Sequence, residues 1–303
     1  MNAKRITALA LALVMILLLA ACGSKTVVND DGTKTEQTER GVKVTQTAAK
    51  AVQTEKYETA DFSMTIPKGW TVTSGGTNIY HSIRVYDPAE PLNQMFVLLK
   101  ADVLLHSQAG KEAWQQNYNM GNTQAALFAK AAVLDNPSTE GFFKIFSQYT
   151  AFASEVEPAY SGYAFPQFGG FTVTDRYPSA SPMKSSALGD EQLRATFTDN
   201  GKEGEGLFAA SVVDFGSFAI SNGNVVGYQL QSVDGGYYMA YNIVAVTAAK
   251  DTFIEWEGVL TDCFKTLQYS DSFVSATNQA SNEKVALAKQ ISQNFNATMD
   301  GFM

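Results

Sequence analysis

A cysteine near the start of the chain carries the clearest chemical signal in the sequence. Two basic residues, Lys4 and Arg5, precede an apolar run that ends in Leu19-Ala20-Ala21-Cys22. A basic start, a short apolar run and small residues at its end are typical of a secretory signal peptide. The run is shorter than the roughly 20 apolar residues that span a bilayer. The sequence therefore predicts an exported protein whose signal covers residues 1–21.

The end of this segment resembles the lipobox of bacterial lipoproteins, Leu-small-small-Cys, at all four positions. In that family the cysteine receives a diacylglyceryl thioether, the signal is cut just before it, and the new amino terminus is usually acylated. Each buried CH₂ contributes about 0.8 kcal/mol, so two or three acyl chains anchor stably where one does not. The resemblance implies lipid attachment at Cys22. The alternative is an ordinary secretory signal with a chance cysteine.

The lipobox implies a location as well as a modification. The protein is expected on the outer face of a bacterial cytoplasmic membrane, or on the periplasmic face of the outer membrane where the envelope has two membranes. The chain carries a formal net charge of −8. A net negative surface argues against binding nucleic acid and against charge-driven adhesion to anionic lipid. Membrane attachment is therefore expected to depend on the acyl chains.

The other side chains that could do chemistry are few and scattered. The chain has two histidines, His81 and His106, and one cysteine besides Cys22, at position 263. Neither histidine lies in a metal-binding or catalytic motif, and Cys263 falls on the apolar stripe of an expected helix, where a buried inert thiol is the commoner outcome. With Cys22 lipidated, no intrachain disulfide is possible. We assign no catalytic residue, no metal site and no cofactor.

One segment suggests binding. Residues 156–178 are rich in Pro, Gly and aromatics, and the candidate contact residues are Tyr160, Tyr163, Phe165, Phe168 and Arg176. Aromatic side chains on such a loop line a pocket or contact a partner protein in many binding sites. The alternative, which we favour, is that the loop folds over a sheet and its rings complete the core.

The elements around these residues follow from hydrophobic periodicity. Hydrophobic content of 45% indicates a real core. Residues 22–56 are polar and predict a flexible tether, and residues 57–270 predict one α+β domain. Within it we expect strands up to about residue 105, a helical insertion at about 109–155, and the aromatic loop at about 156–178. A C-terminal amphipathic helix is expected over 271–303.

The sequence predicts two hairpins in the second half of the chain. It also predicts where two helices begin. Strands 193–198 and 207–213 should pair around Asp199-Asn200-Gly201, and strands 225–233 and 237–246 around Asp234-Gly235-Gly236. Pro137 is expected at the first position of a helix. Thr252 and Glu255 predict a capping box for another.

The stretch from Phe62 to Trp70, with the sequence FSMTIPKGW, resembles the opening strand and Pro-x-Gly-Trp corner of PsbP/Mog1-like domains. The hairpins, the long strand ending at Val246 and the helix from Thr252 extend the resemblance to residues 57–104 and 191–270. It implies an antiparallel sheet flanked by helices, an α/β/α sandwich, and a role in protein binding or assembly. The helical insertion and the aromatic loop depart from a compact member of that group.

Three hypotheses for function remain. The first is a membrane-anchored, non-catalytic binding or assembly module with an envelope protein as partner. The second is a small-ligand-binding lipoprotein that uses the aromatic loop, and the third is a hydrolase of envelope polymers that uses two carboxylates. The hydrolase needs two acids facing each other about 5 to 10 Å apart.

Overall fold

The computed structural model describes residues 25–28, 34–38, 41–45, 50–178, 183, 185–226 and 229–281. Of residues 25–28, 34–38, 41–45, 178, 224–226 and 229–230 only the backbone is described. The expected signal peptide, Cys22 and the end of the expected C-terminal helix, 282–303, lie outside the described residues. No helix among the described residues is long and apolar enough to cross a membrane.

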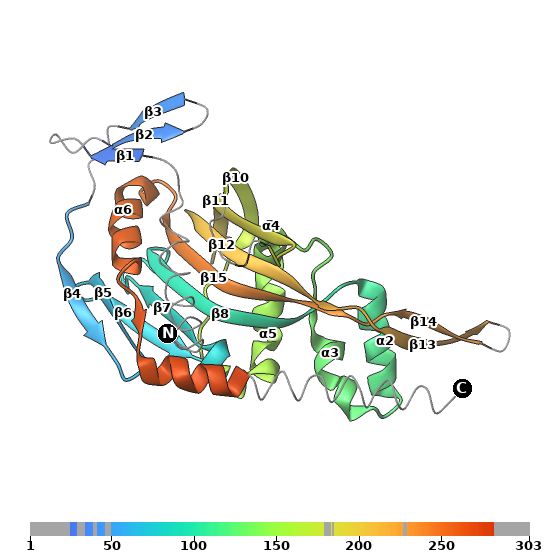
Figure 1. Cartoon of the computed structure of the whole chain (residues 1–303). Helices are drawn as coiled ribbons and strands as arrows, with labels where there is room; N and C mark the ends of the chain where they lie inside the picture. Colours follow the sequence, from blue (N-terminus) through green and yellow to red (C-terminus); the bar gives the residue numbers. More distant parts are fainter. Residues whose placement is uncertain are drawn as a thin grey trace.

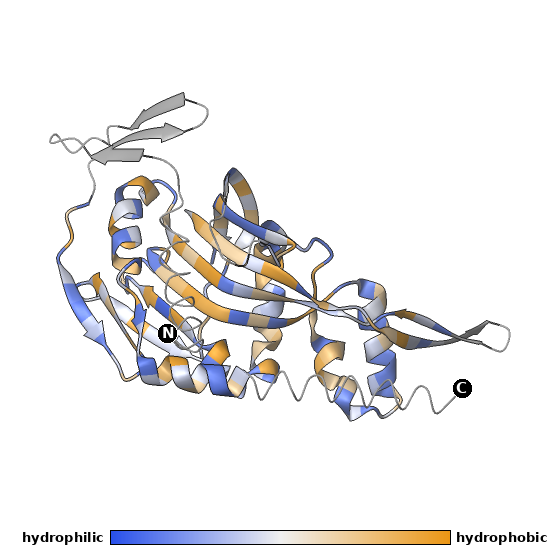
Figure 2. Cartoon of the chain, in the orientation of Figure 1, coloured by the Kyte–Doolittle hydropathy of each residue, from blue (hydrophilic) through white to orange (hydrophobic). Residues whose placement is uncertain are grey.

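An antiparallel sheet forms the centre of the molecule (Figure 1). Its strand order is β10-β11-β12-β15-β8-β7-β6, and the two-residue strand β9 (Ala132–Val133) adds a parallel pair beside β8. The bounds along this order are Gly169–Pro178, Gly189–Asp199, Lys202–Gly216, Tyr237–Ala249, Gln94–Leu105, Ser82–Tyr86 and Thr71–Gly75. The central strands carry most of the apolar residues of the sheet (Figure 2).

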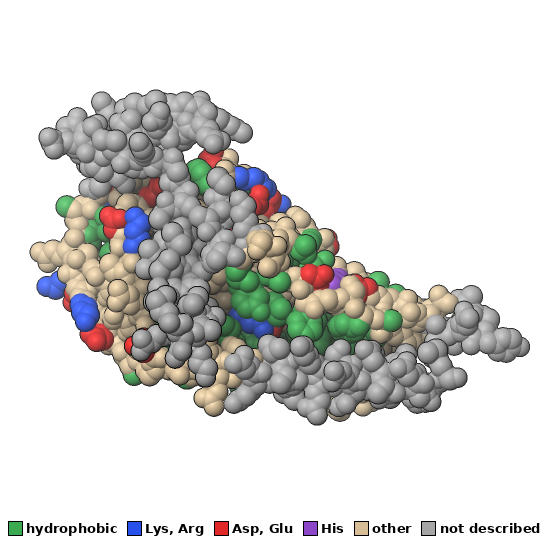
Figure 3. Space-filling model, in the orientation of Figure 1, with side chains coloured by type: hydrophobic (Ala, Val, Ile, Leu, Met, Phe, Trp, Pro, Cys, Tyr) green, Lys and Arg blue, Asp and Glu red, His purple; other side chains and the backbone are tan. Residues whose placement is uncertain are grey.

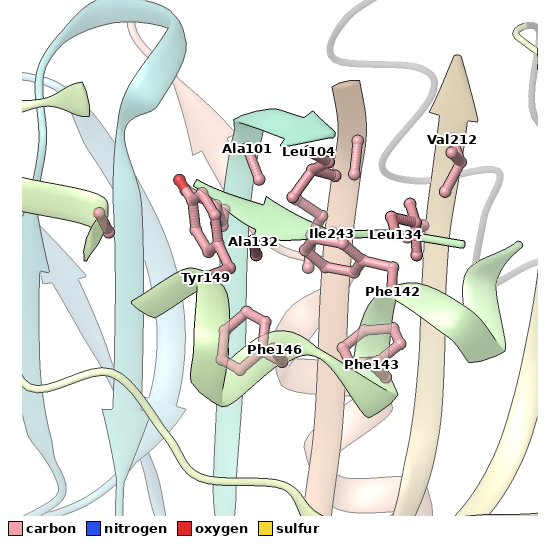
Figure 4. Packing of buried hydrophobic residues seen from close by; sticks show 14 of the residues in the cluster. Ala101, Leu104, Ala132, Leu134, Phe142, Phe143, Phe146, Tyr149, Val212 and Ile243 are labelled. Atoms are coloured by element: carbon pink, nitrogen blue, oxygen red, sulfur yellow. The ribbon is translucent and has the colours of Figure 1, made fainter. Parts of the chain in front are cut away.

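Helices from the insertion pack on one face of this sheet. They are α2 (Gln108–Asn119), α3 (Ala126–Lys130), α4 (Thr139–Lys144) and α5 (Phe146–Val156). The aromatic stripe of α4 and α5 turns inward, and Phe142, Phe146 and Tyr149 have no exposed surface. Figure 4 shows these rings pointing from the helices toward Leu104 and Ile243 of the sheet. Burial of this aromatic stripe fixes the insertion to the sheet.

The other face is covered by α6 (Phe253–Phe264) and by the small sheet β16-β5-β4. The bounds of these strands are Gln268–Tyr269, Phe62–Pro67 and Thr54–Glu58. A second core lies between α6, β5 and the main sheet, and it contains Phe62, Phe253 and Leu260. A helix over 271–281 follows, and its Phe273 joins the same core.

The predicted fold class is confirmed. The chain has an α+β fold with antiparallel sheets, helices on both faces, a helical insertion and a C-terminal helix. The first predicted hairpin is also confirmed, because β11 pairs with β12 from Gly189↔Val212 to Asp199↔Lys202. Asn200 and Gly201 take positive φ angles of 49° and 80° in its turn, as a two-residue hairpin turn requires.

The second predicted hairpin is wrong. Strand β13 (Ala219–Val226) pairs with β14 (Gln229–Asp234), whereas β15 pairs with β12 and β8. Asp234-Gly235-Gly236 links β14 to β15 without reversing the chain into a hairpin. The sequence pattern could not show that β14 and β15 have different partners, because residues 225–233 and 237–246 both alternate. The partner of a strand depends on the rest of the sheet.

Three local predictions also need correction. Residues 22–56 were expected to lack regular structure, but three strands in this segment, 25–28, 34–38 and 41–45, form an antiparallel sheet, and β4 begins at Thr54. Valine and threonine favour strands even in a polar segment. Helix α4 begins after Ser138, whose hydroxyl accepts from the Gly141 N–H, so Pro137 lies before the cap. Thr252 makes no side-chain cap bond.

Candidate functional site

The aromatic loop residues mostly lie in the core. Tyr160 is 3% exposed and Phe168 3% exposed, while Tyr163 and Phe165 are partly buried against the same core. The Phe168 ring centroid lies 5.2 Å from that of Phe146 and 5.1 Å from that of Phe208. The expectation that these rings line a pocket or a contact surface is therefore not met at Tyr160 and Phe168. They complete the core instead.

The polar ends of the loop tyrosines have internal partners. The Tyr160 hydroxyl donates to the Tyr80 carbonyl oxygen, and the Tyr163 hydroxyl bonds Ser82 Oγ at 2.9 Å. Burial raises the pKa of both tyrosines well above the usual range. A buried phenol whose hydrogen bond is made to backbone or serine fixes the loop in place. These tyrosines remain neutral and act as structural residues.

Arg176 is the one candidate contact residue that lies at a hollow on the surface. Its guanidinium pairs with Glu140 and, at 2.7 Å, with Glu191. A groove of about 480 Å³ beside it is lined by Asn136, Ser138, Glu140, Arg176 and residues 187–191. The Lys144 hydrogen bond, outweighing burial and aided by Arg176, holds the pKa of Glu140 below its usual range. The groove is mostly polar; Arg176 pairs with Glu140 and Glu191, and Asp190 accepts a hydrogen bond from Ser211 Oγ at 3.0 Å.

The two histidines lie in opposite surroundings. His81 is 5% exposed among Phe62, Tyr269 and Phe273, with its ring centroid 5.0 Å from that of Phe273. Burial, opposed weakly by Asp61, lowers the pKa of His81 to about 4. His81 is therefore a neutral core residue at pH 7.

His106 bridges two carboxylates. Its Nδ1 lies 2.8 Å from Asp234 Oδ2 and its Nε2 lies 3.1 Å from Asp214 Oδ1. Its ring lies against that of Tyr238, tilted by 39°, with centroids 4.1 Å apart. Burial would raise the pKa of Asp234, but hydrogen bonds from His106, Gly236 and Ser217 outweigh it and hold that pKa low. Both ring nitrogens face carboxylates, so His106 clamps Asp214 and Asp234 together.

The remaining candidates are the Cys263 thiol, which is buried, and clusters that could bind a metal ion. Burial, aided by Asp262, raises the pKa of the Cys263 thiol to about 11. Such a thiol is unreactive at neutral pH. Among the described residues, no group of three or more His, Cys, Asp and Glu side chains is arranged to hold a metal ion.

The feature that sequence analysis missed is a two-stranded arm, β13 and β14, which projects past α2 from the end of the main sheet (Figure 1). Its base is fixed by contacts with β8 and α2. Trp114 Nε1 donates to the Gly235 carbonyl at 3.0 Å, and the His106 N–H donates to the Gly236 carbonyl at 3.2 Å. Figure 3 shows a histidine flanked by acidic side chains where the arm begins.

The arm carries a signal that was available in the sequence. No Asp, Glu, Lys, Arg or His occurs between Asp214 and Asp234, in a chain that is 17% charged. An uncharged stretch with alternating apolar residues usually indicates a buried strand. Here it forms a projecting ribbon, in which Ala219 and Ser232 are exposed. An edge strand without charged residues lacks one of the usual features that block the addition of another strand.

The chain matches no protein-family model, and no curated protein is similar enough to it to count as a match.

Proposed function

We propose that the chain is a lipid-anchored, non-catalytic binding or assembly module of a bacterial cell envelope, and that the arm is its binding element. The anchor is proposed at Cys22 from the lipobox sequence. The observation that supports a binding role is the arm: a two-stranded ribbon with a fixed base and no charged side chain between Asp214 and Asp234. Isolated ribbons of this kind are marginally stable in water, so a partner that pairs with the arm would stabilise it.

The anchor is tested by changing its cysteine. Cys22→Ala should abolish labelling with a radioactive fatty acid and should release the chain from membranes or leave the precursor uncleaved. Cys263→Ala is the matched control, since it removes the other cysteine and should leave labelling and membrane retention unchanged. Labelling and retention that persist in Cys22→Ala would contradict the proposed anchor.

The binding role is tested in the anchored protein. A photoreactive amino acid at Gln231, on β14, should crosslink to protein in the native envelope. The same reporter at Glu58, an exposed position on β4 whose side chain is 63% exposed, is the control and should give a much weaker product. Equal products from the two positions, or none from Gln231, would contradict a binding role for the arm.

A second candidate function is the binding of a small ligand in the polar groove beside Arg176. The observation that favours it is the groove itself, whose about 480 Å³ suits a small molecule. Native mass spectrometry of the purified chain tests it. An additional non-covalent mass that Arg176→Gln removes would support a ligand, and a mass equal to that of the chain alone would argue against one.

A further inference from the structure

The two edges of the arm differ in what they face. On β13, the Asn117 side-chain Nδ2 of α2 donates to the Ser221 carbonyl oxygen at 3.0 Å. That carbonyl must therefore point away from β14. A Cβ on Gly223 would also lie 1.9 Å from Gln116 Nε2, so α2 lies close against this strand. Helix α2 therefore covers the outer edge of β13 at Ser221 and Gly223.

The direction of the Ser221 carbonyl fixes the direction of the groups opposite. Ser221 is paired with Ser232 in the register of the arm. In antiparallel strands, residues directly opposite alternate between pairs that bond each other and pairs whose N–H and C=O groups both point outward. The Gly235 N–H donates to the Phe218 carbonyl at 2.8 Å, so Phe218 and Gly235 form a bonded pair. Ser221 and Ser232 lie three residues further along the arm, where the alternation places a pair whose groups point outward. The Ser232 N–H and C=O therefore point to the outer edge of β14, as do those of Leu230.

The outer edge of β14 is covered by α2 only near the base of the arm. At the base, α2 reaches β14, since a Cβ on Gly110 would lie 2.4 Å from the Asp234 carbonyl oxygen. Two residues further along, Ser232 is exposed. An edge strand normally carries a lysine, a proline or a bulge that blocks the addition of another strand. Residues 229–233 contain none of the charged residues or prolines that would do this, and the register shift of the arm, between Ser221 and Val225, puts the extra residues on β13.

Charge indicates which strand would add here. The chain is acidic, with a net charge of −8, and copies of it repel one another over most of their surface. The stretch between Asp214 and Asp234 is the projecting part that carries no charge. Two copies can therefore approach through their arms at the smallest electrostatic cost. A basic partner would be attracted to the acidic surface elsewhere and gains nothing from an uncharged edge.

We propose that β14 pairs with β14 of a second copy in antiparallel orientation, so that the two arms form a four-stranded ribbon. The inference rests on the proposed binding role of the arm and names its partner. Pairing of identical strands about a two-fold axis is isologous and closes. Because α2 covers the edge of β13, each copy offers one open edge, and assembly stops at a dimer.

The first test is sedimentation velocity of the full mature chain, purified from membranes in detergent with micelles in excess over protein. The wild-type chain should sediment as a dimer at high concentration and as a monomer on dilution. Ser232→Pro removes an outward N–H without removing a bond within the arm, and edge strands tolerate such prolines. It should abolish the dimer. Ser232→Lys, which places like charges near the axis, should do the same without altering the backbone.

The second test distinguishes the two edges. Ser232→Cys, with Cys22 lipidated and Cys263 buried, should form an intermolecular disulfide under mild oxidation in the native membrane. Ser221→Cys is the matched control, because it lies directly opposite on the covered strand, and it should remain monomeric. A wild-type chain that stays monomeric at every concentration, or equal crosslinking from the two positions, would overturn self-pairing. In that case a Gln231 crosslink to a different protein would still support the proposed binding role.

Discussion

Two segments of this chain contradict a simple expectation about where binding occurs. They are the aromatic loop at 156–178, which from Gly169 on forms strand β10, and the arm between Asp214 and Asp234. The loop is dense in aromatic residues, and Tyr160 and Phe168 are nearly fully buried. The arm contains few aromatics and no charge, yet it projects into solvent (Figure 1). Aromatic content therefore indicates core here, whereas the uncharged stretch, which its alternation alone would place in the sheet, forms the projecting arm.

The difference has a physical cause. The Phe168 ring contacts rings of the insertion helices and the sheet, at Phe143, Phe146 and Phe197, so burying it stabilises the fold. The arm is held at its base by hydrogen bonds to α2 and β8, and its distal part lies beyond the core. Changes in the loop should thus alter global stability, whereas changes in the arm should alter association.

The largest effect is expected in the loop. Phe168→Ala removes a ring that packs against Phe143, Phe197 and Phe208, and it should lower the free energy of unfolding by about 3–5 kcal/mol. Urea denaturation measures it. Ser232→Ala in the arm is the control and should leave stability unchanged. A loss below about 1 kcal/mol in Phe168→Ala would mean that the loop is not part of the core.

The next largest effect concerns the buried histidine of the core. The unfolded chain protonates His81 below about pH 6.5, whereas the folded protein does so only below about pH 4. Between these values the unfolded state binds more protons, so the free energy of unfolding should fall as the pH falls, by about 3 kcal/mol in total. Above about pH 6.5 His81 is neutral in both states, and its burial no longer lowers the free energy of unfolding.

The measurement compares urea denaturation of the wild-type chain and His81→Phe from pH 7 to pH 4. Other groups contribute to both proteins, and the difference between the two curves reports His81. The wild-type curve should fall more steeply. Parallel curves would show that His81 is accessible to protons in the folded state, which its apolar surroundings argue against.

A smaller effect is expected at the base of the arm. Trp114→Phe keeps the ring stack on Phe128 but loses the hydrogen bond to the Gly235 carbonyl, worth about 1 kcal/mol. Amide exchange in the arm should become faster, while exchange in residues 160–171 should not change. Faster exchange throughout the chain would mean that the arm and the core unfold together.

The smallest effect is expected at Arg176. Its side chain is 48% exposed, and surface ion pairs contribute little. Arg176→Gln should change the free energy of unfolding by no more than about 0.5 kcal/mol, as measured by thermal or urea denaturation. A larger loss would show that the pairs with Glu140 and Glu191 hold β10 in place.

Much of the fold could be predicted because its signals are local. Alternation identified the strands, Ser107 caps α2 by accepting from the Gly110 N–H, and Asn200-Gly201 marked its hairpin. The partner of β14 could not be predicted, because alternation gives the faces of a strand and not its neighbour. The short strands at 25–45 were missed because their composition is that of a polar linker.

The candidate site was harder to predict than the fold. Tyr160 and Phe168 were correctly weighed as possible core residues, since burial of aromatics is the common outcome. The clamp of His106 between Asp214 and Asp234 joins residues more than 100 positions apart in the sequence. Its formation depends on the register of β8 with β15, which no local pattern specifies.

The proposed pairing of the arms is tested most directly by hydrogen exchange at the two outward amides of β14, Leu230 and Ser232, as a function of protein concentration. The alternation of the arm points these amides outward, so they should exchange rapidly in dilute protein and become protected as the concentration rises. The amides of the aromatic loop should be unaffected. Exchange at Leu230 and Ser232 that stays equally fast at every concentration would contradict the pairing of two copies through β14.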